Sequence, residues 1–212
     1  MAETTQGDPV GVNAPDRHDL ILAAAEQVFS KNGYAATTMD AVAQEAGVAK
    51  GSIYNHFESK QHLFISLYNY VTRRDFDQLD ALVKQPASAG ERIERVLDDW
   101  AERVETFRVF GALMLEFWAT AAREHNEGAF GEEFTGHYEQ ARAHVADIVR
   151  QGIESGEFAD HVNPEVAASL IMAVIRGITV QLILGFDEEV SEELLDTLKR
   201  SVLTSLTQPL DD

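Results

Sequence analysis

The segment from Lys50 to His56 carries side chains that are suited to contacts with DNA. A lysine can bind phosphate or guanine, an asparagine can bridge the edge of an adenine, and a tyrosine can stack or bond to phosphate. A glycine lets the backbone approach its partner closely. The residues that we expect to face outward are Lys50, Gly51, Ser52, Tyr54, Asn55 and His56.

Two short helices joined by a tight turn would hold these side chains outward. Thr38 can cap the first of them, and Gly47 can form the turn. The positions that we expect to face inward are Met39, Val42, Ala43, Ala46, Val48, Ile53 and Phe57. This pattern predicts a helix-turn-helix, which lays its second helix in the major groove. A plain packing hairpin is the alternative, because many helical hairpins contain a glycine turn.

The rest of the chain is typical of an all-α protein. Prolines are scarce, and apolar residues recur at intervals of three and four between them. We expect a first helix over 16–31, stopped by Asn32 and Gly33, and a helix that begins after the cap at Ser59. The predicted organisation is a flexible leader over 1–14, a three-helix DNA-binding domain over 15–62, and a helical ligand-binding and dimerisation domain over 63–212.

The composition excludes cysteine chemistry and gives the protein a strongly acidic surface. The 212 residues include no cysteine, which excludes disulfides and thiolate sites. The formal net charge is −19, and only five of the basic residues are lysines. This surface fits either a salty cytoplasm or a simple need for solubility. The N-terminus lacks the features of a signal peptide, so we expect a cytoplasmic protein.

The run from Arg17 to Phe64 resembles the DNA-binding domain of the TetR family of transcription regulators. The resemblance rests on Ala-Ala and Phe29 in the first helix, Gly33-Tyr34, Thr37-Thr38, Ala46-Gly47-Val48, Gly51, Ile53-Tyr54, His56-Phe57, Lys60 and Leu63. The remaining residues resemble the family in being all-helical and in the Gly-Glu-Phe turn over 156–158.

This resemblance adds two phosphate contacts to the DNA contacts expected from the residues themselves. It implies that Thr37 or Thr38 meets phosphate at the start of the second helix, and that Lys60 clamps phosphate from the start of the fourth. Ala49 departs from the family pattern, in which a hydroxyl residue often caps the recognition helix. A cap contributes about 1 kcal/mol, so this helix should be less firmly set.

Pairing of two copies is expected through the last two helices. The segment from Pro164 to Gly185 is apolar on almost all sides, with Ala167, Ala168, Ala173 and Gly177 small enough for close helix approach. Because Arg176 and Gln181 interrupt the run, we do not expect a membrane span. The resemblance implies a four-helix interface in a homodimer, whose recognition helices would reach half-sites on a palindrome.

A cluster of aromatic and apolar side chains predicts a cavity for an apolar or aromatic ligand, although most such residues in a helical protein belong to the core. Two successive aromatics, Phe117 and Trp118, cannot share one helix face. The predicted ligand-binding residues are Trp100, Phe107, Phe110, Met114, Phe117, Trp118, Phe134, Tyr138 and Arg176.

Charges and histidines within apolar runs leave further alternatives. Glu116 and Arg176 could pair with each other or with other side chains, or Arg176 could meet an anionic ligand such as a carboxylate. His125, His137 and His144 invite a metal site, but three histidines without cysteine are a weak signal, and we expect no metal.

The predicted function is therefore a ligand-responsive transcriptional regulator. A repressor that binds a palindromic operator as a dimer and is released by a small hydrophobic or amphipathic effector fits best, and an activator is the alternative. We expect no enzymatic activity and no cofactor, because no nucleophile elbow, phosphate-binding glycine loop or metal-ligand run is present. A helical adaptor that binds a protein partner is the rival from another class.

Overall fold

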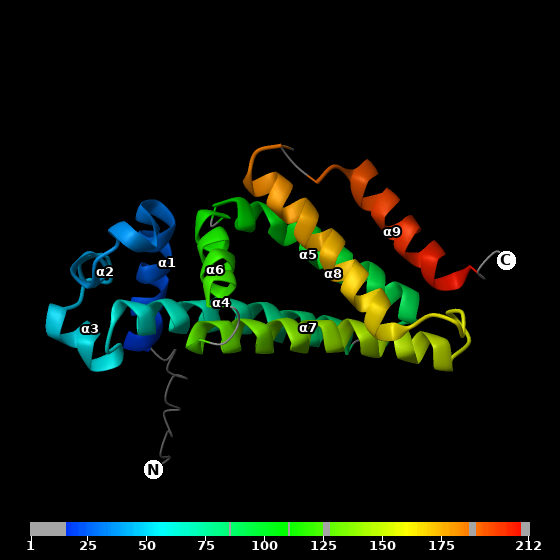
Figure 1. Cartoon of the computed structure of the whole chain (residues 1–212), viewed down its shortest axis with the longest axis horizontal. Coiled ribbons are helices and arrows are strands. Elements are labelled where there is room, and N and C mark those ends of the chain that lie inside the picture. The colour runs from blue at the N-terminus through cyan, green and yellow to red at the C-terminus, as the bar shows by residue number, and fades with distance from the viewer. Residues whose placement is uncertain (1–15, 85, 110, 125–127, 187–189, 209–212) are drawn as a thin grey trace, which may run out of the picture.

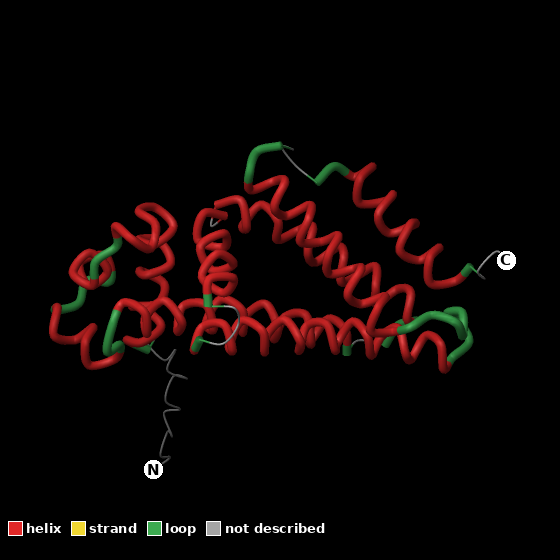
Figure 2. The backbone as a smooth tube through the Cα atoms, viewed as in Figure 1, coloured by secondary structure: helices red, strands yellow, loops and turns green. Residues whose placement is uncertain are grey.

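A computed structural model describes residues 16–84, 86–109, 111–124, 128–186 and 190–208. Over these residues the chain forms nine helices and no strand, as the sequence pattern predicts (Figures 1 and 2). In chain order they are α1 (Arg17–Ala36), α2 (Met39–Glu45), α3 (Lys50–His56), α4 (Lys60–Val83), α5 (Ala89–Val109), α6 (Gly111–Arg123), α7 (Ala129–Glu154), α8 (Pro164–Ile183) and α9 (Glu192–Thr207).

Helices α1 to α3 form one end of the elongated molecule (Figure 1). The Asp16 side chain caps α1 by accepting from the amide of His18. Gly33 has φ 75° and breaks the helical path inside α1, so the helix is interrupted at the residue expected to stop it and one further turn follows. This interruption turns the chain towards α2.

A first hydrophobic core joins this end to the body of the molecule. It contains buried residues of α1 to α4, including Phe29, Ile53 and Leu67, together with Phe117 of α6 and Phe130 of α7. Helices α4, α6 and α7 thus pack directly against the helix-turn-helix and share its core.

A second core lies among α5, α7, α8 and α9, with Ile93, Val149 and Leu198 among its buried residues. The predicted Gly-Glu-Phe turn closes one side of it. Gly156 has φ 78°, and a Cβ at Gly152 would lie 2.3 Å from a ring carbon of Phe158, so only glycine lets this ring pack over α7.

Glu157 of this turn caps α5. Its two carboxylate oxygens each accept an amide at 2.8 Å, from Ala89 and from Gly90. Partial burial acts to raise the pKa of Glu157, but these amide bonds outweigh it, and the net pKa lies below its ordinary value. The bonds fix the start of α5 to the end of α7.

Helices α4 and α7 lie side by side along the length of the molecule, and α6 stands steeply across them (Figure 1). Helix α8 packs against α7 and α5, and Val166, Leu170 and Val174 on another of its faces are exposed. By length and composition, α8 is the described helix that could cross a membrane, although a core helix passes the same test. The expected boundary at residue 62/63 falls inside α4, next to Leu63 of the first core.

Candidate nucleic-acid interface and effector cavity

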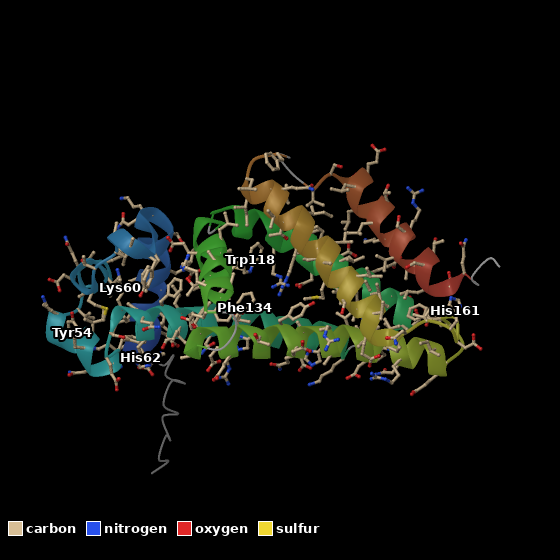
Figure 3. The ribbon with its side chains drawn as sticks, in the orientation of Figure 1. Tyr54, Lys60, His62, Trp118, Phe134 and His161 are labelled. Carbon is tan, nitrogen blue, oxygen red and sulfur yellow. The ribbon has the colours of Figure 1, made fainter. Side chains whose placement is uncertain are left out.

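Helix α3 carries Tyr54 at the opposite end of the molecule from Trp118 and Phe134 (Figure 3). Ile53 on its inner side is buried, and Phe57 directly after it is also buried. Tyr54 is 46% exposed, and Gly51 and Asn55 are exposed. Ala49 provides no side-chain bond to the helix start, as its residue type predicts. One face of this short helix therefore packs on the protein core, and the opposite face is open to solvent.

Lys50 at the start of α3 is paired with an acid. Its Nζ lies 2.8 Å from Oδ2 of Asp40 on α2, and both side chains are exposed. The hydrogen bond to Asp40 and its negative charge raise the pKa of Lys50. Part of the positive charge of the exposed face is thus neutralised within the protein.

The remaining two polar residues of α3 differ in exposure from those at its centre. Ser52 and His56 are half-buried, and the His56 ring lies 6.2 Å from the ring of His18 and 6.3 Å from that of Phe57. His56 therefore lies at the edge of the exposed face, between α3 and the start of α1.

Thr38 and Thr37 have different surroundings. Thr38 is exposed and caps α2 by accepting from the amide of Ala41 at 3.1 Å, which confirms the predicted cap. Thr37 is only 1% exposed, and its hydroxyl donates to the carbonyl of Gly33 at 2.8 Å. Of the two threonines expected to meet phosphate, the Thr38 side chain is therefore the accessible one, and that contact stays a prediction.

Lys60 also differs from its expected role. Its Nζ donates to three carbonyl oxygens, those of Tyr34 at 2.8 Å, Ala35 at 3.2 Å and Thr37 at 3.0 Å, and lies 4.5 Å from the centre of the Tyr34 ring. All three donors of an ammonium group are used in this way. In the structure Lys60 holds the α1–α2 junction rather than facing outward to phosphate.

A cavity of about 220 Å³ lies between α4, α5, α6, α7 and α8. Its walls are mainly apolar and aromatic, which is typical of small-molecule sites. The lining residues are Tyr68, Thr72, Val96, Trp100, Arg103, Met114, Trp118, Phe134, Ala141, Val145, Met172, Ile175, Arg176 and Thr179. Figure 3 shows Trp118 of α6 and Phe134 of α7 close together in this region. A second cavity shares Trp118, Phe134 and Arg176 with the first.

Five of the predicted ligand-binding residues line this cavity: Trp100, Met114, Trp118, Phe134 and Arg176. Phe117 does not, because it is fully buried in the first core among Phe64, Tyr68 and Phe130. The successive aromatics thus separate as expected, with Trp118 at the cavity and Phe117 in the core. Tyr138 does not line the cavity, but its ring contacts the guanidinium of Arg176, which does. The side chain of Phe107 and the whole of Phe110 lie outside the described residues.

The sequence interpretation missed several lining residues. Tyr68 and Thr72 lie four apart on α4, and Met172, Ile175 and Thr179 lie three and four residues from one another on α8, on the side of Arg176. This spacing was visible in the sequence as a helix face, but a face that lines a cavity has the same pattern as one that fills a core.

Glu116 and Arg176 do not pair with each other. An oxygen of Glu116 accepts the amide of Tyr34 at 2.6 Å, and the Arg176 guanidinium lies 4.3 Å from the ring centre of Tyr138 and 5.8 Å from that of Phe134. Burial lowers the pKa of Arg176, while Tyr138 and Tyr68 act in the opposite direction. Among described residues, no group of three or more metal-ligating side chains forms, and His125 lies outside the described residues.

Comparison with known proteins decides the family. A model described as bacterial regulatory proteins of the tetR family matches residues 21–67, and one described as BetI-type transcriptional repressor, C-terminal, matches residues 89–207, which is more than half of the chain. The chain belongs to the TetR family. The resemblance over Arg17 to Phe64 is thereby confirmed, and so is the division into an N-terminal helix-turn-helix and a C-terminal helical part.

Curated relatives of this TetR protein are transcriptional regulators. The chain is 38% identical over 82 residues to the regulator YhgD of Bacillus subtilis, which is 39% of this chain and 43% of the relative. It is 41% identical over 75 residues to the repressor KstR of Mycolicibacterium smegmatis, 35% of each chain. These matches span less than half the length of the relatives.

Solved TetR structures share the fold at low sequence identity. A TetR regulator from Haloarcula marismortui superimposes with a TM-score of 0.79 at 20% identity, over 92% of this chain and 100% of that one. FadR from Bacillus subtilis, solved with stearoyl-CoA, has a TM-score of 0.68 at 21% identity, over 92% and 100% of the two chains. A regulator from Saccharomonospora viridis, solved with choline, has a TM-score of 0.72 at 20% identity, over 89% and 94%.

Proposed function

We propose that this TetR protein is a ligand-responsive repressor that binds a palindromic operator as a homodimer and is released by a small effector. The observation that carries this proposal is the open face of α3, where Lys50, Tyr54 and Asn55 are exposed over the buried Ile53. Such a helix offers donors to phosphates and base edges. The match to a repressor-type C-terminal model favours repression over activation. Access to chromosomal DNA requires a cytoplasmic protein.

The exposed side of α8 supports the homodimer. Val166, Leu170 and Val174 lie four residues apart on one face and are 56%, 63% and 42% exposed. Exposed Ala173 and Gly177 on the same side leave room for close approach. A twofold pair joined through this stripe would bury it, and would present two copies of α3 to a palindrome.

Helix α6 supports a route from the effector to DNA. Its residues Met114 and Trp118 line the cavity, whereas Glu116 between them bonds to the amide of Tyr34 at the α1–α2 junction. A Cβ at Gly33 would lie only 3.0 Å from the second oxygen of Glu116, so the contact is close. A shift of α6 on filling the cavity would move this junction and the adjoining α2 and α3.

Binding selection from a random duplex library tests the proposal. We expect the purified protein to enrich a palindrome with half-sites about one helical turn apart, or in a related spacing. Light scattering should give a dimer, and Leu170→Lys should give a monomer that binds the selected operator much more weakly. Absence of any enriched sequence at low salt would contradict the proposal and favour an adaptor that binds a protein.

A further inference from the structure

The polar groups of the cavity lining suggest the chemical class of the effector, on the basis of the proposed function. Most of them are satisfied within the protein. The indole N–H of Trp100 donates to the Thr179 hydroxyl at 3.0 Å, and that hydroxyl donates to the carbonyl of Ile175 at 2.8 Å. Burial raises the pKa of the Tyr68 hydroxyl to about 12, so this group stays neutral.

The two arginines of the lining differ in their partners. Arg103 forms an ion pair with Asp99 on its own helix, and Asp99 is buried, so the charges of these two groups offset each other. Arg176 forms no ion pair with any carboxylate of the described residues, and contacts the Tyr138 and Phe134 rings instead. No acidic residue lines the cavity over the described part of the chain. The cavity therefore carries a net positive charge.

A second donor lies beside this charge. Trp118 lines both cavities together with Arg176, and its indole N–H makes no hydrogen bond within the described residues. Indole is a donor only, and guanidinium offers up to five N–H groups and no acceptor. Both groups therefore call for an acceptor, and the guanidinium calls for a negative one.

We propose that the effector is a compact carboxylate, with its carboxylate group held by Arg176 and the Trp118 indole N–H and its apolar body among Val96, Trp100 and Met172. The volume of about 220 Å³ lies just below the range of about 300–1,000 Å³ that is usual for ligand sites, so this cavity by itself accommodates only a small apolar body. The opposite class is a quaternary ammonium, which aromatic walls such as Tyr68, Trp100 and Phe134 would suit. The unpaired charge of Arg176 repels it.

Three probes with the same phenylalkyl body separate these classes: 4-phenylbutyrate, 4-phenylbutanamide and phenylpropyl-trimethylammonium. The chain has two tryptophans, Trp100 and Trp118, and both line the cavity, so intrinsic fluorescence of the protein without DNA reports occupancy. We expect the carboxylate to bind at least about tenfold more tightly than the amide, and the cation most weakly.

Variants show whether Arg176 is the source of this preference. Arg176→Gln should abolish the preference for carboxylate over amide and leave amide binding unchanged, whereas Arg176→Lys should retain part of it. Arg142→Gln is the matched control, because Arg142 pairs with Glu139 on the surface of α7 and does not line the cavity. Thermal unfolding of each variant checks that it folds.

Three results would overturn the proposal: equal binding of the probes, tighter binding of the cation, or no fluorescence response to any of them. A carboxylate preference that survives Arg176→Gln in a folded protein would also overturn it. Each of these results leaves operator binding untouched, since no DNA is present. Failure of the effector class is thus distinct from failure of the proposed regulator.

Discussion

The DNA-facing end and the cavity of this TetR protein are assembled from the sequence in opposite ways. The helix-turn-helix draws its residues from one continuous segment, Thr38 to Phe57. The cavity draws its lining from five helices, between Tyr68 and Thr179. The helix-turn-helix is a local structure that exposes hydrogen-bond donors. The cavity forms only when helices that are distant in the sequence pack together.

The two regions also differ in how they treat charge. At the α1–α2 junction, Lys60 has a partner for each donor and Glu116 accepts from the amide of Tyr34, so these half-buried charges have a structural role. In the cavity Arg176 contacts aromatic rings and has no acidic partner among the residues that the structure describes. A charge that the protein satisfies holds its own structure, and one that it leaves without a counter-charge is available to a ligand.

The largest effect should come from Lys60→Ala. Removing the ammonium leaves three carbonyl oxygens at the α1–α2 junction without their donor, and bonds from a charged donor contribute about 2 kcal/mol. Urea unfolding should show a loss of that size, and operator and random DNA should be bound less well in the same proportion. Lys50→Ala is the control, and should change DNA affinity without comparable loss of stability. If Lys60→Ala leaves the stability unchanged, the main role of Lys60 would be contact with a DNA phosphate.

Asn55→Ala should follow in size. The side chain is exposed on α3 and its removal should leave the fold intact. A lost base contact costs about 1–3 kcal/mol at one base step. Binding to operators with each half-site position varied should show a loss of preference at a single step. A uniform loss at all positions would mean that Asn55 contacts the DNA backbone.

Glu116→Gln tests the link between the regions with a smaller change. Gln retains an acceptor for the Tyr34 amide but loses the charge, so the hydrogen bond weakens by about 1 kcal/mol. Operator affinity without effector should change little, and the decrease in operator affinity caused by effector should shrink several-fold. Glu132→Gln, an exposed acid on α7, is the control. A full effector response in Glu116→Gln would exclude this contact as the link.

The smallest expected effect concerns charge on the DNA-facing surface. Asp40→Asn frees Lys50 from its acidic partner at 2.8 Å. Affinity for random DNA should rise several-fold at low salt, and the slope of log affinity against log salt should steepen by at most about one. Asp160→Asn, remote from α3, should leave both unchanged. If Asp40→Asn changes neither the affinity for random DNA nor its salt dependence, Lys50 does not contact the phosphates.

The helices and the exposed residues of α3 could be predicted from the sequence, because they depend on neighbours in the chain. The Thr38 cap, the φ 75° interruption at Gly33 and the burial of Ile53 all follow from local rules. The hydrogen bonds of Thr37 and Lys60 to the end of α1 could not be predicted, because hydrogen bonds between segments leave no periodic signal in the sequence.

The cavity was predicted only in part for the same reason. Trp100 and Trp118 could be predicted from the cluster of aromatic residues, and Arg176 from its charge within an apolar run. Tyr68 and Thr179 look like ordinary core residues in sequence, and only packing of α4 and α8 around the space distinguishes them. The hydrogen bond from the Tyr34 amide to Glu116 joins residues 82 positions apart in the chain, and nothing in the sequence around either residue indicates it.

The most direct test of the central claim is one titration with two signals. The probe that binds most tightly is added to protein bound to a fluorescent selected operator, while tryptophan fluorescence and DNA anisotropy are recorded together. Filling of the cavity and release of DNA should occur with the same midpoint. A tryptophan signal that saturates while the operator remains fully bound would contradict the account, because the cavity would then be occupied without control over α3.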